Sequence, residues 1–257
     1  MRKINYRILA GRDDRNTLAF EKKYAKIIRR ALISQADSYF KTGSMSNDMF
    51  EVVSDIYREM FNYWLPLEWK RLDGDVISMK ASGTTGFFIE MWSRFINEYI
   101  LTHIASKVVN IDATTKEMIR RGIADGTVMG LEFERISEMI RSDIINSKRA
   151  MTIARTEVGE AVNIAKKKSS DDWQNETGQE LVKIWIHRGA KDPRDWHLSM
   201  DDGRQIPKNS KFIVTNPDTG KSEEMDYPHD PTASAENVIN CGCQVMYVRA
   251  GYAGRTR

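Results

Sequence analysis

The chain has 257 residues, of which 41% are hydrophobic and 29% charged, with two cysteines and a formal net charge of +3. This length allows one or two domains with a buried core, and the apolar content excludes a disordered chain. No run of about 18 apolar residues could span a membrane, and residues 1–15 lack the apolar segment of a secretory signal. Two cysteines do not form a disulfide framework, so we expect a reducing compartment.

Positive charge is concentrated near the N-terminus. Residues 1–30 hold ten Lys and Arg against three acidic residues, which leaves a local net charge of +7. Such a segment is suited to contacting DNA phosphates or an acidic protein surface. The alternative is that these side chains form the solvated face of a first helix.

Apolar residues at spacings of three and four predict about six helices up to residue 170. Their apolar stripes cover residues 20–32, 53–64, 88–100, 114–126, 136–144 and 150–165. Gly43 is expected to end the first helix, and the second is expected to stop before Pro66. Thr114 and Glu117 have the spacing of a capping box, which predicts the start of a short helix that ends near Gly126.

The pattern changes at residue 171, after which five of the six prolines and both cysteines occur. Alternation predicts a half-buried strand over 181–187, with further strands at 211–215 and 244–248. Residues 216–220 form a predicted turn, and Ser234 is expected to cap a short helix over 235–240. We therefore expect an α+β protein: a basic helical arm (1–70), a helical region (71–170) and a small α+β module with a short antiparallel sheet (171–257).

Glu157 is the first residue that breaks the pattern of its helix, because it lies inside an apolar stripe between Ala154 and Ala161. A buried carboxylate requires a hydrogen-bond or charged partner. Arg155 projects about 200° away around the helix, so the partner must come from another element. We interpret Glu157 as a structural carboxylate that joins its helix to the sheet. A catalytic acid or base, or an exposed position at the edge of the stripe, are the alternatives.

A second cluster contains Asp192, Arg194 and His197, followed by Asp202 and Gly203. A histidine flanked by carboxylates can act as a general base or as a metal ligand. The sequence contains no complete hydrolase, metalloprotease, phosphate-loop or EF-hand motif beside it. The same residue types also suit a turn with a structural histidine, which is the interpretation that we favour.

The third cluster is Cys241-Gly242-Cys243, which could complete a tetrahedral zinc site with His197 and His229. Structural zinc sites usually separate their cysteines by two to four residues, and this pair is separated by one. Buried free thiols are the alternative that the spacing favours.

These clusters together resemble the signature of the phage head morphogenesis family, which includes the phage Mu F-like minor head proteins. The resemblance covers roughly residues 80–250, and Gly242 stands where the family usually has Arg. Its landmarks, in chain order, are Arg155, Glu157, Asn163, Trp185, Asp192, Arg194, His197, Asp202, Gly203, Pro228, Asn240, Cys241 and Cys243.

The resemblance implies a minor capsid protein of a tailed bacteriophage or prophage. Such a protein is made in the host cytoplasm, associates with the portal protein and lies inside the virion capsid. It assists head assembly, DNA packaging or DNA ejection, and it is not an enzyme and needs no cofactor apart from the zinc considered above. The alternatives are a metal-dependent nuclease or hydrolase that uses Glu157, His197 and Asp202, and a module that binds DNA through residues 1–30.

Overall fold

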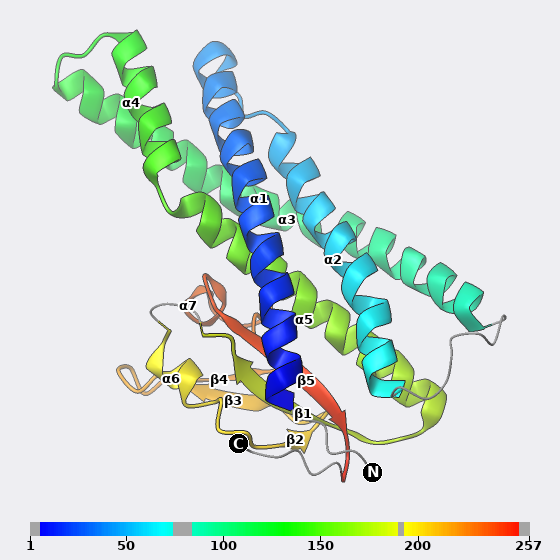
Figure 1. The fold of residues 1–257 in the computed structure, drawn as a ribbon. Helices are drawn as coiled ribbons and strands as arrows, with labels where there is room; N and C mark the ends of the chain where they lie inside the picture. The colour runs from blue at the N-terminus through cyan, green and yellow to red at the C-terminus, as the bar shows by residue number, and fades with distance from the viewer. Residues whose placement is uncertain (1–5, 74–83, 190–192, 252–257) are drawn as a thin grey trace.

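The computed structural model describes residues 6–73, 84–189 and 193–251, and it shows the expected α+β architecture (Figure 1). Five long helices form an elongated bundle, and a small module with two sheets lies at one end of it. The helices are α1 (Tyr6–Thr42), α2 (Asp48–Asp73), α3 (Thr84–Val128), α4 (Phe133–Asn146) and α5 (Arg149–Thr177).

Helix α3 replaces two of the predicted helices, which is why five long helices are found instead of about six. The capping-box prediction at Thr114 is wrong: its hydroxyl donates to the Asn110 carbonyl within the helix. The prediction that a helix ends near Gly126 is confirmed, because α3 ends at Val128. A Cβ at Gly126 would lie 2.5 Å from Ile136 of α4, and one at Gly122 would lie 2.5 Å from Ile140. These glycines therefore let α4 pack closely against α3.

Helix α2 continues through Pro66 to Asp73, so the prediction that it stops before this proline is wrong. Proline in a helix interior removes a hydrogen bond and costs about 3 kcal/mol. The turns that follow it bury Trp69 and Leu72, and Arg249 donates to the Leu72 carbonyl at 2.6 and 2.9 Å. Tertiary packing against the rest of the chain offsets the local cost.

The C-terminal module contains a three-stranded antiparallel sheet in the order β2-β1-β5 and a β3-β4 hairpin. The predicted strands are confirmed as β1 (Leu181–His187), β3 (Phe212–Thr215) and β5 (Cys243–Arg249), and the predicted 235–240 helix as the shorter α7 (Ala235–Val238). Sequence periodicity missed β2 (Ile206–Pro207), which has two residues, and β4 (Ser222–Met225), which is mostly polar. It also missed the single-turn helix α6 (Asp195–Leu198), which lies in a segment rich in turn-forming residues.

Strand β1 is buried on both faces, although its alternation predicts a half-buried strand. Ile184 and Ile186 pack with Met246 against Ala10 at the beginning of α1. Trp185, on the opposite face, joins the main core. The difference arises because Phe212 of β3 and His197 of α6 cover the face of Trp185, which the alternation alone leaves open to solvent. Helix α1 covers the apolar face of Ile184 and Ile186.

A buried polar network holds α1 against α5 and the sheet. Lys166 Nζ lies 2.7 Å from Asp13 Oδ2 and donates to Gln244 Oε1 at 2.8 Å. Glu21 lies 2.7 Å from Arg188 and 3.4 Å from Arg155. The expected domain boundaries at residues 70 and 170 fall inside α2 and α5. Within the described ranges, no helix combines the length and apolar character that crossing a membrane requires.

Candidate metal centre

His197, Cys241 and Cys243 come together in the interior of the module. The imidazole belongs to α6, and the thiols lie at the connection from α7 into β5. His197 Nδ1 is 3.4 Å from Cys241 Sγ and 4.0 Å from Cys243 Sγ, and the three candidate ligand atoms lie within 4.8 Å of one another. Tetrahedral zinc would place nitrogen and sulfur ligands about 3.6 Å apart. This group therefore could hold a metal ion.

The hydrogen bonds around His197 fix which ring nitrogen faces the thiols. The indole N–H of Trp196 can only donate, and it lies 2.9 Å from Asn237 Oδ1. The same oxygen is 3.0 Å from His197 Nε2, so Nε2 must carry the proton that it accepts. Nδ1 of the neutral ring is then an unprotonated donor atom directed at both sulfurs. Metal-binding histidines are commonly oriented by such a second hydrogen bond.

The surroundings of the two thiols favour one thiolate. The pKa of Cys241 is lowered, first because it accepts a hydrogen bond from Cys243 and further because His229 lies beside it. Burial raises the pKa of Cys243, an effect that the indole N–H of Trp185 opposes. Thiolate is the form that binds metal. Both thiols are free in the structure.

His229, the fourth predicted ligand, lies next to this group without being part of it. Its side chain is fully buried, and neither ring nitrogen has a hydrogen-bond partner in the described part of the chain. Its ring packs against α5 so closely that a Cβ at Gly159 would lie 2.5 Å from Nε2. A buried imidazole with two unpaired nitrogens needs an explanation, and a ligand role beside Cys241 supplies one.

Hydrogen bonds of Glu223 connect the centre to the β3-β4 hairpin. Asn237 Nδ2 donates to Glu223 Oε2 at 3.1 Å, and the Ser234 backbone N–H donates to the same oxygen at 2.9 Å. This backbone hydrogen bond is the main reason that the pKa of Glu223 falls to about 2. Glu223 thereby fixes α7, whose Asn237 orients His197.

We expect these hydrogen bonds of Glu223 to weaken in acid. Because the folded-state pKa of Glu223 lies below its ordinary value of 4.5, its stabilising contribution is complete above pH 4.5 and is lost as the pH falls towards about 2. The hydrogen exchange of the α7 amides, measured between pH 5 and pH 2.5 with intrinsic rates removed, should rise in the wild type. Glu223→Gln should show faster exchange already at pH 5 and little further change. Equal pH profiles for both proteins would contradict this assignment.

The other landmark residues join α5 to the end of the chain. Arg155 Nη1 donates to Asn240 Oδ1 at 2.9 Å, and Asn163 Oδ1 accepts the Val245 backbone N–H at 2.8 Å. Arg194 donates to the Ile239 carbonyl at 2.7 Å. Trp185 and His197 pack edge to face, with their ring centroids 5.4 Å apart. Asp192 lies outside the described residues.

Glu157 is buried and paired with another element, as expected, but that element is not the sheet. Tyr57 of α2 donates to its Oε2 at 3.0 Å, and Lys107 of α3 lies 3.8 Å away. The interpretation as a joint between α5 and the sheet is therefore corrected: Glu157 joins α5 to α2 and α3. Tyr57 and Lys107 could not be identified as its partners from the sequence. They precede Glu157 by 100 and 50 residues, and apolar periodicity indicates local structure only.

The structure does not bring the three residues of the hydrolase alternative to one cleft. His197 borders a pocket of about 230 Å³ with Arg194 and Cys243, whereas Glu157 borders a different one. Asp202 is exposed, and its carboxylate accepts the Arg204 backbone N–H at 2.8 Å in a turn that Gly203 completes with φ +78°.

Comparison with known proteins gives one distant relative to report. The uncharacterized protein YqbB of Bacillus subtilis is 22% identical over 219 residues, which are 84% of this chain and 65% of the relative. The chain thus spans less than two thirds of that relative's length. No protein-family model matches the sequence, and no solved structure gives a significant match.

Proposed function

We propose that the protein is a minor capsid protein of a tailed bacteriophage or prophage, which associates with the portal and assists head assembly, DNA packaging or ejection. The observation that carries this proposal is the convergence of the signature residues. Arg155, Asn163 and Asn240 connect α5 with the last strand, and Arg194 holds the end of α7. Residues that act together in this way are expected of a true motif, and Arg155, Asn163 and Arg194 each have a structural partner.

The turn between α3 and α4 is the surface that best suits a protein partner. It lies at the end of the bundle remote from the sheets (Figure 1). Val128 is 88% exposed and Met129 68% exposed, and Phe133 is 55% exposed while it packs its ring on Phe40. Neighbouring exposed apolar side chains of this kind commonly mark protein–protein contacts.

Co-expression with the portal protein of the same operon tests the proposal. Affinity capture of the tagged protein should retain the portal, and Val128→Asp should reduce the retained amount at least ten-fold. Leu101→Asp is the matched control, because Leu101 is 78% exposed on the same helix but distant from the turn. Failure of the wild-type protein to retain the portal would contradict portal association. Equal loss in both variants would contradict the assigned surface.

We further propose that the His197, Cys241 and Cys243 group binds structural zinc, with His229 as the fourth ligand. Two thiolates and two imidazoles form a closed tetrahedral set of the kind found in structural zinc sites. The unprotonated His197 Nδ1 and the unpaired nitrogens of His229 support this assignment. When bound, zinc would cross-link α6, the 229–243 segment and β5.

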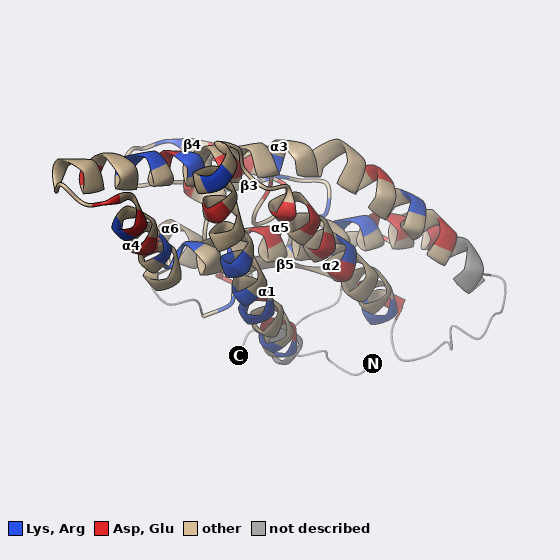
Figure 2. Cartoon of the chain, turned by 90° about the horizontal axis from the view of Figure 1, so that it is seen from above, with Lys and Arg blue, Asp and Glu red and all other residues tan. Residues whose placement is uncertain are grey.

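A basic face on α1 favours DNA as a second partner. Figure 2 shows Lys and Arg along this helix, whose outward positions at spacings of three, four and seven carry exposed cations that have no acidic partner among the described residues. They are Arg12, Arg15, Lys22, Lys26 and Arg30.

DNA affinity through this face should fall steeply with salt, because each phosphate contact releases counterions. Replacing Arg15, Lys22 and Lys26 by Gln should flatten the slope of log Kd against log salt by about two to three. Point substitutions are preferable to deleting residues 1–30, since the inner face of α1 is buried against α5 and the sheet. Fluorescence anisotropy with duplex DNA measures both quantities, and a salt-independent affinity would contradict the proposal.

A further inference from the structure

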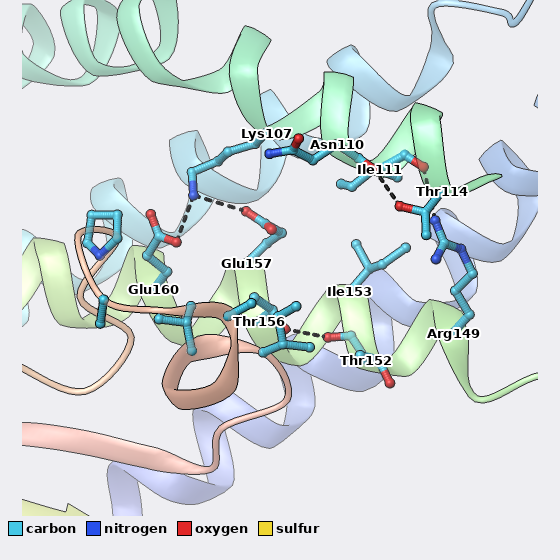
Figure 3. A pocket seen from close by; sticks show the side chains of 15 residues that line it. Lys107, Asn110, Ile111, Thr114, Arg149, Thr152, Ile153, Thr156, Glu157 and Glu160 are labelled. Atoms are coloured by element: carbon cyan, nitrogen blue, oxygen red, sulfur yellow. Dashed lines mark hydrogen bonds and ion pairs between the residues drawn. The ribbon is translucent and has the colours of Figure 1, made fainter. Parts of the chain in front are cut away.

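A pocket of about 340 Å³ lies between α3, the first half of α5 and residues 231–239 (Figure 3). Ile111, Ile153 and Val238 form apolar walls, and Ile239, which is 46% exposed, also lines it. Pockets of this size that combine apolar walls with a few polar groups are typical of ligand-binding sites. Of the signature residues only Glu157 borders it, and no candidate ligand of the metal centre does.

Arg149 supplies an uncompensated positive charge at one end of the pocket. Its Nη2 atom donates to the Ile111 carbonyl and to Thr115 Oγ1, each at 3.0 Å, while its Nε atom is buried and has no partner. Throughout the described ranges, no carboxylate lies within ion-pair distance of this guanidinium. Burial alone lowers its pKa. A partly buried guanidinium without a counter-ion is costly, and an anion that enters the pocket would relieve that cost.

The opposite end of the pocket is already occupied by a charge network (Figure 3). Lys107 lies 2.7 Å from Glu160 and 3.8 Å from Glu157, so two carboxylates share one ammonium there. That end repels an additional anion. The distribution of charge therefore orients a ligand with its acidic group at Arg149 and its apolar part over Ile153.

Two polar side chains at the pocket point to a polypeptide instead of a free small acid. The exposed amide of Asn110 and the hydroxyl of Thr152 have no hydrogen-bond partner within the part of the chain that the structure describes. An amide and a hydroxyl can pair with both the N–H and the C=O groups of a peptide backbone. We propose that this pocket binds a segment of a partner protein in which an acidic residue adjoins an apolar one.

Methyl-detected NMR with labelled isoleucines tests the pocket directly, and it requires no knowledge of the partner. The probe is the peptide N-acetyl-Leu-Glu-Leu-amide, compared with its Leu-Gln-Leu counterpart. Addition of the acidic peptide should shift the Ile111, Ile153 and Ile239 methyl signals. The neutral peptide should bind at least ten-fold more weakly, because it lacks the charge-assisted hydrogen bond to Arg149.

Three variants separate binding from folding. Arg149→Gln should bind the acidic peptide at least ten-fold more weakly. Ala235→Leu, an exposed position at the pocket, should also block binding while Arg149 is retained. Arg121→Gln is the matched control, because its guanidinium is 75% exposed on α3 and pairs with Glu117. It should leave the affinity unchanged.

Several outcomes would overturn the inference. Equal affinities for the acidic and neutral peptides would remove the role of Arg149. Unchanged binding by Ala235→Leu would place the peptide elsewhere. Hexanoate is the third ligand to be tested. If it bound as tightly as the acidic peptide and with the same dependence on Arg149, the natural occupant would be a small acid. A failed portal capture leaves this test intact, since the peptides probe the pocket alone.

Discussion

Replacing Asp13 by Ala is expected to lower the free energy of unfolding by about 3–5 kcal/mol, as is typical when one partner of a buried ion pair is removed. Asp13 accepts from Lys166, whose side chain is only 2% exposed and lies with Nζ 4.9 Å from the Trp64 ring centroid. Without Asp13, the ammonium keeps only the neutral Gln244 oxygen as a hydrogen-bond acceptor. The loss in the free energy of unfolding is then the cost of an uncompensated charge inside the protein.

Urea unfolding followed by circular dichroism measures this loss. The double variant Asp13→Ala/Lys166→Met should recover a substantial part of it, because it removes the stranded charge along with its partner. Asp55→Ala is the matched control: its carboxylate is 62% exposed and pairs with Arg58 on the surface, so the expected cost is about 0–1 kcal/mol. Equal effects of Asp13→Ala and Asp55→Ala would contradict the buried network.

Chelation of zinc is expected to lower the melting temperature by about 8–16 °C. Zinc present at 1,000 times its dissociation constant stabilises the folded state by about 4 kcal/mol. A loss of 1 kcal/mol shifts the melting temperature of a chain of this size by about 2–4 °C. Elemental analysis of the purified protein should find one zinc ion per chain. Differential scanning fluorimetry with and without a chelator measures the shift.

Variants of the thiols show whether the effect belongs to this site. The double variant Cys241→Ser/Cys243→Ser should contain no zinc, and a chelator should not change its melting temperature. His103→Gln is the control, because His103 is an exposed histidine of α3, and it should retain zinc. A wild-type protein without zinc would contradict the metal proposal. In that case Cys241→Ser alone should cost little stability.

Local periodicity predicted the helices and the longer strands correctly, and it failed where distant packing decides the structure. Pro66 is a strong local stop signal, yet α2 passes it because Trp69 and Leu72 are buried beyond it. Gly126 lies two residues before the end of α3, and the room that it provides for Ile136 of another helix has no local signal. Neither partner can be identified from the residues next to it in the chain.

In the candidate site, too, residue types predicted part of the arrangement and distant packing decided the rest. Residue types alone brought His197, Cys241 and Cys243 together as candidate ligands, and the structure groups these three. The sequence could not show that Asn237 would fix the His197 ring, because that depends on the fold of α7 over α6. It also could not identify the partners of Glu157, which come from α2 and α3.

The network around α1 also constrains the order of events during synthesis. Gln244 donates to Thr17, which lies 227 positions earlier in the chain. Lys166, the ion-pair partner of Asp13, follows it by 153 positions. A growing polypeptide emerges N-terminus first, so α1 leaves the ribosome long before the residues that bury its inner face exist. Its contacts with α2 can form early, whereas its contacts with the sheet can form only when translation is almost complete. Until then, Asp13 and Glu21 on that face remain hydrated, which keeps the exposed helix soluble.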